Sequence, residues 1–145
     1  MTINEIQDEI IEEFAGLDDW MDRYQLLIDL AGAMPPLDAK YKTKDNLIEG
    51  CQSNVWLHAE EGDDGTVTFA AESEALIVGG IISLLIRVLN GQKATDILNT
   101  PLYFIDEIGL HEHLSPTRSN GLVAMIKQMR LYALAFSSRH ESTDD

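Results

Sequence analysis

Hydrophobic residues recur at helical spacing near both ends of the chain, whereas the middle of the chain alternates between hydrophobic and polar positions as strands do. Near the N-terminus, Ile6, Ile10 and Phe14 lie four residues apart. They follow Thr2 and Glu5, which have the spacing of a capping box, in which each side chain satisfies a free backbone N–H group. The pattern predicts a first helix that ends near residue 16.

A second helix is expected between Asp18, a typical N-cap residue, and the helix-breaking pair Pro35 and Pro36. Its inward-facing stripe consists of Trp20, Tyr24, Leu27 and Ala31. The segment 33–45 carries Pro, Asp and Lys, which is typical of a surface connection.

The middle of the chain predicts a small antiparallel sheet. Residues 55–58 and 67–70 alternate as strands do, and the turn at 60–65 contains the Asp-Gly pair typical of a β-hairpin. Residues 47–49 are a candidate for a further short strand.

Helical patterns return from Ser73 onward. Ser73 is a candidate N-cap, and Glu74 suits the first turn of a helix that runs to about Leu89. A short helix at 95–99 and an amphipathic segment at 101–108 follow.

The last helix is predicted to begin at Ser115 and Pro116, because serine caps helices and proline suits their first position. Its apolar stripe consists of Leu122, Met125, Ile126, Met129, Tyr132, Ala133 and Phe136. Residues 137–145 are polar and are expected to form a flexible tail. Because helices, strands and helices follow one another in groups, we expect one domain, 1–145, of the α+β class.

The chain is strongly acidic, with 25 acidic and 10 basic residues and a formal net charge of −15. Such a charge repels phosphate backbones and argues against nucleic-acid binding, although it can steer docking onto a basic protein. The single cysteine cannot form an intrachain disulfide or, by itself, hold a zinc ion or an iron–sulfur cluster. His111 and His113 are too few to make a metal site, so no metal is expected.

Residues 1–14 are acidic and lack the basic start of a signal peptide. The longest apolar run, Ala75 to Ile86, is interrupted by glycines and is too short to span a bilayer. A lone thiol is compatible with a reducing compartment. The sequence therefore predicts a soluble cytoplasmic protein with no membrane contact.

Cys51 is the first candidate for chemistry. It lies in a turn-rich segment between predicted strands, with Gly50 before it and Gln52, Ser53 and Asn54 after it. Loops on rigid scaffolds often present reactive groups, and the N–H groups of such a turn can stabilise a thiolate. The alternative is that Cys51 is a small buried hydrophobic side chain, as free cysteines often are.

Arg118 and its neighbours Ser119, Asn120 and Gly121 are the second candidate. A cation in the first turn of a helix opposes the helix dipole, and Asn and Gly are poor helix formers. Such local violations tend to mark functional sites, although an exposed first turn also tolerates them.

Glu72 and Glu74 flank Ser73 at a strand-to-helix junction. They could pair with Arg118 or dock a partner. The alternative is that they are acids placed favourably at the start of a helix.

Three segments together resemble the SufE family of sulfur acceptors. They are residues 48–57 (IEGCQSNVWL), 73–80 (SEALIVGG) and 114–125 (LSPTRSNGLVAM). Their order and spacing agree with that family over nearly the whole chain. A cysteine segment alone would be a weak signal, but three linked segments are specific.

The resemblance implies a curved antiparallel sheet with helices packed on it, similar to iron–sulfur scaffold proteins. It implies that Cys51 accepts persulfide sulfur from a cysteine desulfurase, stimulates that enzyme and passes the sulfur on for iron–sulfur cluster assembly. Pyridoxal phosphate would belong to the desulfurase, and this chain, a monomer or homodimer, would need no cofactor. The supporting or partner-docking positions would be Gly50, Gln52, Glu72, Glu74 and Arg118.

The sequence departs from the family pattern near the second segment. Glu72 and Glu74 stand where aspartates are usual, and Gly79 stands where lysine is usual. These changes leave the thiol chemistry untouched and affect partner contacts.

Two other classes remain open. A stand-alone thiol enzyme would need a base or a resolving group near Cys51, and none is evident. A regulatory module that binds a partner without thiol chemistry would need only the acidic surface. For the sulfur relay, we expect no turnover without a partner and a cysteine loop that is closed until docking.

Overall fold

The structure is a computed structural model, described here for the backbone of residues 1–143 and the side chains of residues 1–139. Its first two helices are α1 (Ile3–Ala15) and α2 (Trp20–Ala33). The capping box of α1 is confirmed, because the backbone N–H groups of Thr2 and Glu5 each donate to the other residue's side chain at 3.1 Å. The N-cap of α2 is Asp19 rather than Asp18, because the Asp19 carboxylate accepts from the backbone N–H of Met21 at 2.9 Å.

The segment between α2 and the sheet is a surface connection, as predicted. We call residues 34–46 the outer loop, which contains two short 3₁₀ helices, η1 (Ala39–Tyr41) and η2 (Lys44–Asn46). Leu37 is its one fully buried side chain.

The sheet has the strand order β1-β2-β3, with antiparallel neighbours: β1 (Val55–Glu61), β2 (Thr66–Ser73) and β3 (Gln92–Lys93). Leu47 contributes a single bridge to Trp56 instead of a full strand. Side chains alternate along β1 and β2, so that one face of the sheet is buried. That face consists of Val55, Leu57, Ala59, Val67, Phe69 and Ala71.

Helix α3 (Leu76–Leu89) begins later than predicted. Ser73 pairs with Val55 at the end of β2, and its hydroxyl accepts from the backbone N–H of Ala75 at 3.1 Å in a turn before the helix. Because β2 stays paired with β1 as far as Ser73, Glu74 precedes the helix instead of lying in its first turn.

Gly80 explains how closely α3 packs on α2. A Cβ atom at this position would lie 2.1 Å from the carbonyl oxygen of Leu27, so no larger residue fits without moving the backbone. The glycine at this position thus permits the close packing of α3 on α2.

Four helices complete the chain: α4 (Ala94–Asn99), α5 (Phe104–Glu107), α6 (Leu110–His113) and α7 (Pro116–Thr143). His111 and His113 lie on α6, which Gly109, at a φ of 77°, separates from α5. The start of α7 is as predicted, and the Ser115 hydroxyl accepts from the backbone N–H of Arg118 at 3.3 Å. The backbone of residues 137–143, expected as a flexible tail, continues as helix, and residues 144–145 lie outside the described residues.

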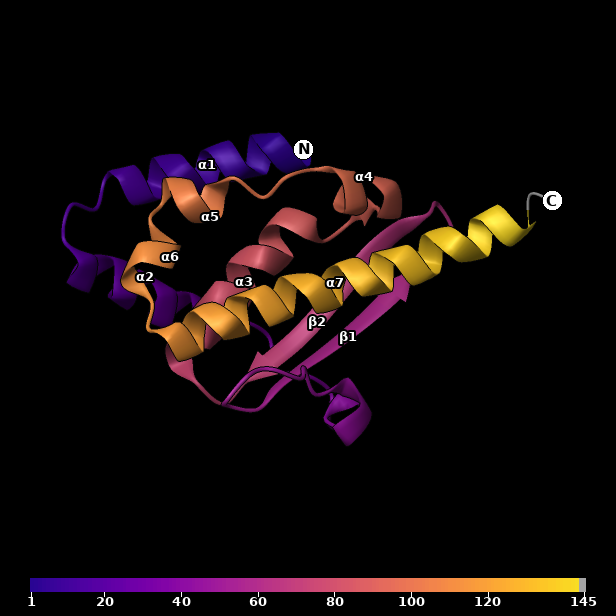
Figure 1. Ribbon diagram of the computed structural model, residues 1–145, viewed down its shortest axis with the longest axis horizontal. Coiled ribbons are helices and arrows are strands. Elements are labelled where there is room, and N and C mark those ends of the chain that lie inside the picture. The colour runs from indigo at the N-terminus through magenta and orange to yellow at the C-terminus, as the bar shows by residue number, and fades with distance from the viewer. Residues whose placement is uncertain (144–145) are drawn as a thin grey trace.

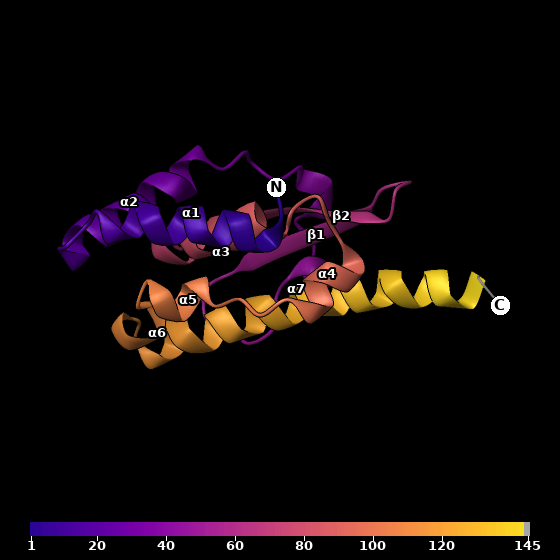
Figure 2. The same cartoon turned by 90° about the horizontal axis from the view of Figure 1, so that it is seen from above.

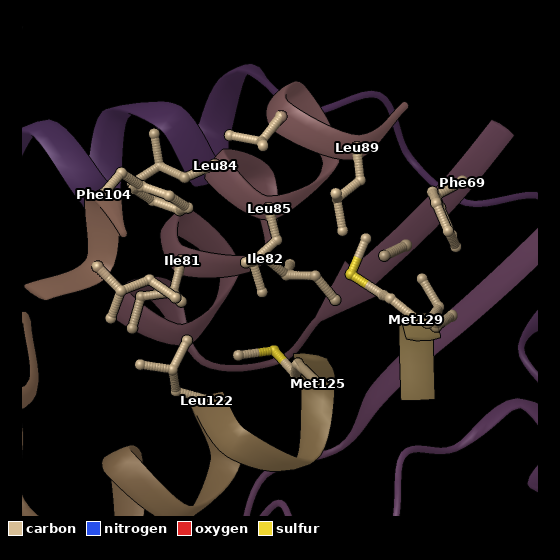
Figure 3. Packing of buried hydrophobic residues seen from close by; sticks show 14 of the residues in the cluster. Phe69, Ile81, Ile82, Leu84, Leu85, Leu89, Phe104, Leu122, Met125 and Met129 are labelled. Atoms are coloured by element: carbon tan, nitrogen blue, oxygen red, sulfur yellow. The ribbon is translucent and has the colours of Figure 1, made fainter. Parts of the chain in front are cut away.

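The helices lie on the buried face of the sheet (Figure 1), and α1, α2 and α3 form one group while α5, α6 and α7 form another (Figure 2). The core lies where α3, α7 and the sheet meet, with Ile82 and Leu85 of α3 near Met125 and Met129 of α7 (Figure 3). Since helices and an antiparallel sheet occupy separate parts of the chain, the predicted α+β class is confirmed.

Candidate functional site

Cys51 lies in an irregular segment before β1, which we call the cysteine loop (residues 49–54). Its side chain is half-buried against the first turns of α7. The thiol donates to the backbone carbonyl of Gly121, with 3.7 Å between sulfur and oxygen. A single long sulfur hydrogen bond is a weak tether, since thiols are poor donors.

Gly50 gives the cysteine loop its shape. Its φ of 96° lies in the left-handed region that side chains disfavour, so glycine is needed here. A Cβ atom would also lie 3.1 Å from the Cβ of Ala124 on α7. Gly50 thus lets the loop approach α7 closely enough to place the thiol.

A cavity of about 390 Å³ opens beside the thiol. Three segments meet around it: the cysteine loop, the start of α3 and the start of α7 (Figure 1). The α7 side consists of Ser115, Thr117, Arg118 and Gly121. The structure thus brings the predicted residue Arg118 together with Cys51 and Gln52, from which it is far apart in the sequence.

Burial raises the pKa of the Cys51 thiol above its ordinary value. Arg118 lines the cavity, but in this closed arrangement it is burial that sets the direction of the shift in the thiol pKa. The closed loop therefore holds a neutral thiol. Because the thiolate is the nucleophile, the closed form is the less reactive one.

The two glutamates lie apart from the cavity lining. The Glu72 carboxylate accepts from the backbone N–H of Leu37 at 3.2 Å and from the ammonium of Lys42 at 2.5 Å. Glu74 accepts from the side-chain amide of Asn54 at 3.3 Å. Among the described side chains neither glutamate pairs with Arg118, so Glu72 fixes the outer loop and Glu74 borders the cysteine loop.

Sequence reasoning missed part of the cavity wall. Ala75, the N-cap of α3, and Val78 on α3 contribute to it, and Thr117 contributes from α7. Ala75 and Val78 belong to the segment 73–80 that resembles the family, but only the fold shows that they lie beside the cysteine loop. Thr117 is adjacent to Arg118, so the unusual composition of that turn was a usable signal.

The described residues contain no group of three or more His, Cys, Asp or Glu side chains that could hold a metal ion. His58 bonds to Glu60, and His113 stacks on Trp20 with 3.8 Å between the ring centroids. Within the same residues, no helix has the length and apolar character needed to cross a membrane.

The fold and the site together define a small α+β protein that presents one sheltered cysteine thiol beside a cavity. Residues 8–133 match the SufE family model, described as an Fe-S metabolism associated domain. The chain therefore belongs to the SufE family, as the three sequence segments indicated, and this membership assigns it to Fe–S metabolism.

Similar proteins agree with this assignment. An uncharacterized SufE-like protein of Rhizobium meliloti is 39% identical over 127 residues, which cover 85% of this chain and 91% of the relative. The chloroplastic/mitochondrial SufE-like protein 1 of Arabidopsis thaliana is 33% identical over 92% of this chain, which spans 36% of that longer protein.

A solved structure of a hypothetical protein from Thermus thermophilus has the same fold. Its TM-score is 0.74 at 24% sequence identity, with 92% of this chain and 96% of that chain covered.

Proposed function

We propose that Cys51 accepts the terminal sulfur of a persulfide on a pyridoxal-phosphate-dependent cysteine desulfurase and carries it towards an iron–sulfur scaffold. The observation that carries this proposal is the placement of the chain's one thiol beside a cavity, within a domain of the SufE family. The pyridoxal phosphate belongs to the desulfurase, and this chain needs no cofactor of its own.

The transfer is a thiol exchange. The Cys51 thiolate attacks the outer sulfur of the desulfurase persulfide, the sulfur–sulfur bond of the donor breaks, and the desulfurase cysteine leaves as a thiolate. The proton of the Cys51 thiol passes to solvent. One sulfur atom moves from one protein to the other, and no outside oxidant or reductant takes part.

Reaction requires the cysteine loop to open. The closed loop holds a neutral thiol, and a long sulfur hydrogen bond to Gly121 tethers it. Docking on the desulfurase draws Cys51 out of its half-buried position, which removes the burial that disfavours the thiolate. Gly50, with its left-handed backbone, is the hinge. The transfer thereby also relieves the desulfurase of its product and stimulates its turnover.

The exposed residues around the thiol suit partner docking. Gln52 and Arg118 line the cavity mouth, and Glu74 borders the end of the cysteine loop. Glu72 supports this surface indirectly by holding the outer loop. We propose that the protein acts in the cytoplasm, as a monomer or homodimer.

A stand-alone thiol enzyme is less well supported. The residues that line the cavity include no His, Asp or Glu that could deprotonate Cys51. A regulatory module without thiol chemistry leaves the single sheltered thiol without a role.

The test is intact-mass measurement after incubation with a cysteine desulfurase and cysteine. We expect the wild-type chain to gain one sulfur atom, lost again on reduction, and Cys51→Ser to gain none. Desulfurase turnover should rise with the wild type and stay basal with Cys51→Ser. An unmodified wild type would overturn the proposal, as would equal stimulation by both proteins.

A further inference from the structure

Gly121 lies inside helix α7, next to the thiol. A glycine in a helix interior is unfavourable, because alanine forms helices better and orders less backbone. The residue is buried, and its backbone follows the helix. No turn or left-handed backbone conformation requires a glycine at this position. The absence of a side chain therefore matters for the space next to it.

That space faces Cys51. A Cβ atom on Gly121 would lie 3.5 Å from the Cys51 sulfur, which is an ordinary van der Waals contact. Apart from its two chain neighbours and the helix's own backbone, no other described atom would come within 4 Å. An alanine is therefore compatible with the free thiol. The same alanine would not fit if Cys51 carried a second sulfur atom pointing towards Gly121. A sulfur–sulfur bond of about 2.0 Å would take up most of the distance between the Cys51 sulfur and the alanine Cβ.

The contact of the Gly121 carbonyl with Cys51 also differs between the free thiol and the persulfide. It accepts the thiol proton of Cys51 at 3.7 Å. In a persulfide the inner sulfur carries no proton, so this hydrogen bond is lost and the outer sulfur becomes the only possible donor. The space beside Gly121 and the hydrogen bond to its carbonyl therefore both depend on whether Cys51 carries a second sulfur.

We propose that Gly121 is a positioning residue that leaves room for the outer sulfur, so that the cysteine loop can close over the loaded persulfide. The outer sulfur lies in the cavity that Gly121 and Cys51 both line. The closed loop then stores the sulfur away from solvent thiols between its collection and its delivery. This inference rests on the proposed role of Cys51 as a sulfur carrier.

The test compares wild type, Gly121→Ala and a control, Asn120→Ala, an exposed residue on the same turn that does not line the cavity. Each protein is loaded chemically with polysulfide, whose outer sulfur is attacked by the Cys51 thiolate while the shortened polysulfide leaves. After removal of the polysulfide, dithiothreitol is added and the loaded fraction is followed by intact mass. Dithiothreitol is oxidised to its cyclic disulfide, hydrogen sulfide leaves, and the Cys51 thiol is restored.

We expect Gly121→Ala to lose its sulfur at least fivefold faster than wild type and Asn120→Ala. The alkylation rate of the unloaded thiol should change less than twofold in both variants, because alanine is compatible with the closed loop around a free thiol. A merely structural effect of the substitution would change both rates together.

Equal rates of sulfur loss in the wild type and Gly121→Ala would overturn the inference, as would a parallel rise in alkylation. Neither result bears on the proposed function, which is tested separately by loading from the desulfurase and by stimulation of that enzyme.

Discussion

The outer loop and the cysteine loop precede β1 one after the other, and the protein holds them in opposite ways. Glu72 fixes the outer loop through Leu37 and Lys42, and Tyr41 stacks on His58 with 3.7 Å between the ring centroids. The cysteine loop is bonded to Glu74 at its end, through Asn54, but at its centre it has only the sulfur hydrogen bond from Cys51. Charge-assisted and aromatic contacts are the stronger kind. The outer loop is therefore the more strongly held of the two, as the proposed opening of the cysteine loop requires.

The first prediction, with the largest expected effect, removes the aromatic contact that holds the outer loop to β1. Tyr41→Ala removes the stacking on His58 and the hydrogen bond from the Tyr41 hydroxyl to Glu60 at 3.3 Å. We expect the free energy of unfolding in urea to fall by about 1–2 kcal/mol, the usual range for a lost aromatic pair and its polar contact.

The matched control is Gln52→Ala, an exposed residue of the cysteine loop. Its free energy of unfolding should stay within about 0.5 kcal/mol of wild type, as for most surface positions. Equal losses in the two variants would contradict the comparison, because both loops would then be anchored alike.

The second prediction removes the charge that fixes the outer loop. Glu72→Gln should lower the free energy of unfolding at neutral pH by about 0.5–1 kcal/mol, the range of a partly exposed ion pair with one added hydrogen bond. Glu74→Gln is the control, since Glu74 has an exposed bond to a neutral amide, and it should lose less.

The pH dependence of Glu72→Gln tests the cause. The hydrogen bond from Lys42, followed by that from the backbone N–H of Leu37, lowers the pKa of Glu72 below its ordinary value. Stability from this group is therefore present above the unfolded pKa of about 4.3 and is lost as the pH falls through the lower folded pKa. The gap between wild type and Glu72→Gln should close in that acidic range, and a constant gap would assign the loss to packing.

The two loops also differ in how much of them the sequence could predict. The surface course of the outer loop followed from its prolines and charges. Its contacts did not, because His58 and Glu72, which hold it, lie on strands that only the folded sheet brings beside the loop. Cys51, Gly50 and Arg118 were candidates from local features of the sequence, and the resemblance to the SufE family gave them a common role.

Helix periodicity and capping residues predicted most elements, since both are local. Asp18 and Ser73 are both good capping residues, but the next residue, Asp19, caps α2, and pairing with Val55 holds Ser73 in β2. The cavity wall at Ala75 and Val78 could not be predicted, because it depends on the packing of α3 against α7.

The last prediction, with the smallest effect, concerns the titration of the cysteine loop itself. Burial raises the pKa of Cys51, so stability from the neutral thiol is present below the unfolded pKa of about 8.5 and is lost as the pH rises through the higher folded pKa. The wild type should therefore lose more stability than Cys51→Ala across that alkaline range. The raised pKa values of Tyr103 and Tyr132 are common to both proteins and cancel.

The titration can be followed directly, because Cys51 is the only thiol. The ultraviolet absorbance of the thiolate, with Cys51→Ala as the blank, should have its midpoint above the ordinary thiol value in the native protein and at that value in urea. A native midpoint at or below the ordinary value would mean that Arg118 and the N-terminus of α7 outweigh burial. The closed loop would then stabilise a thiolate, and opening would not make the thiol more reactive. In that case the weaker attachment of the cysteine loop, compared with the outer loop, would not serve the chemistry of Cys51.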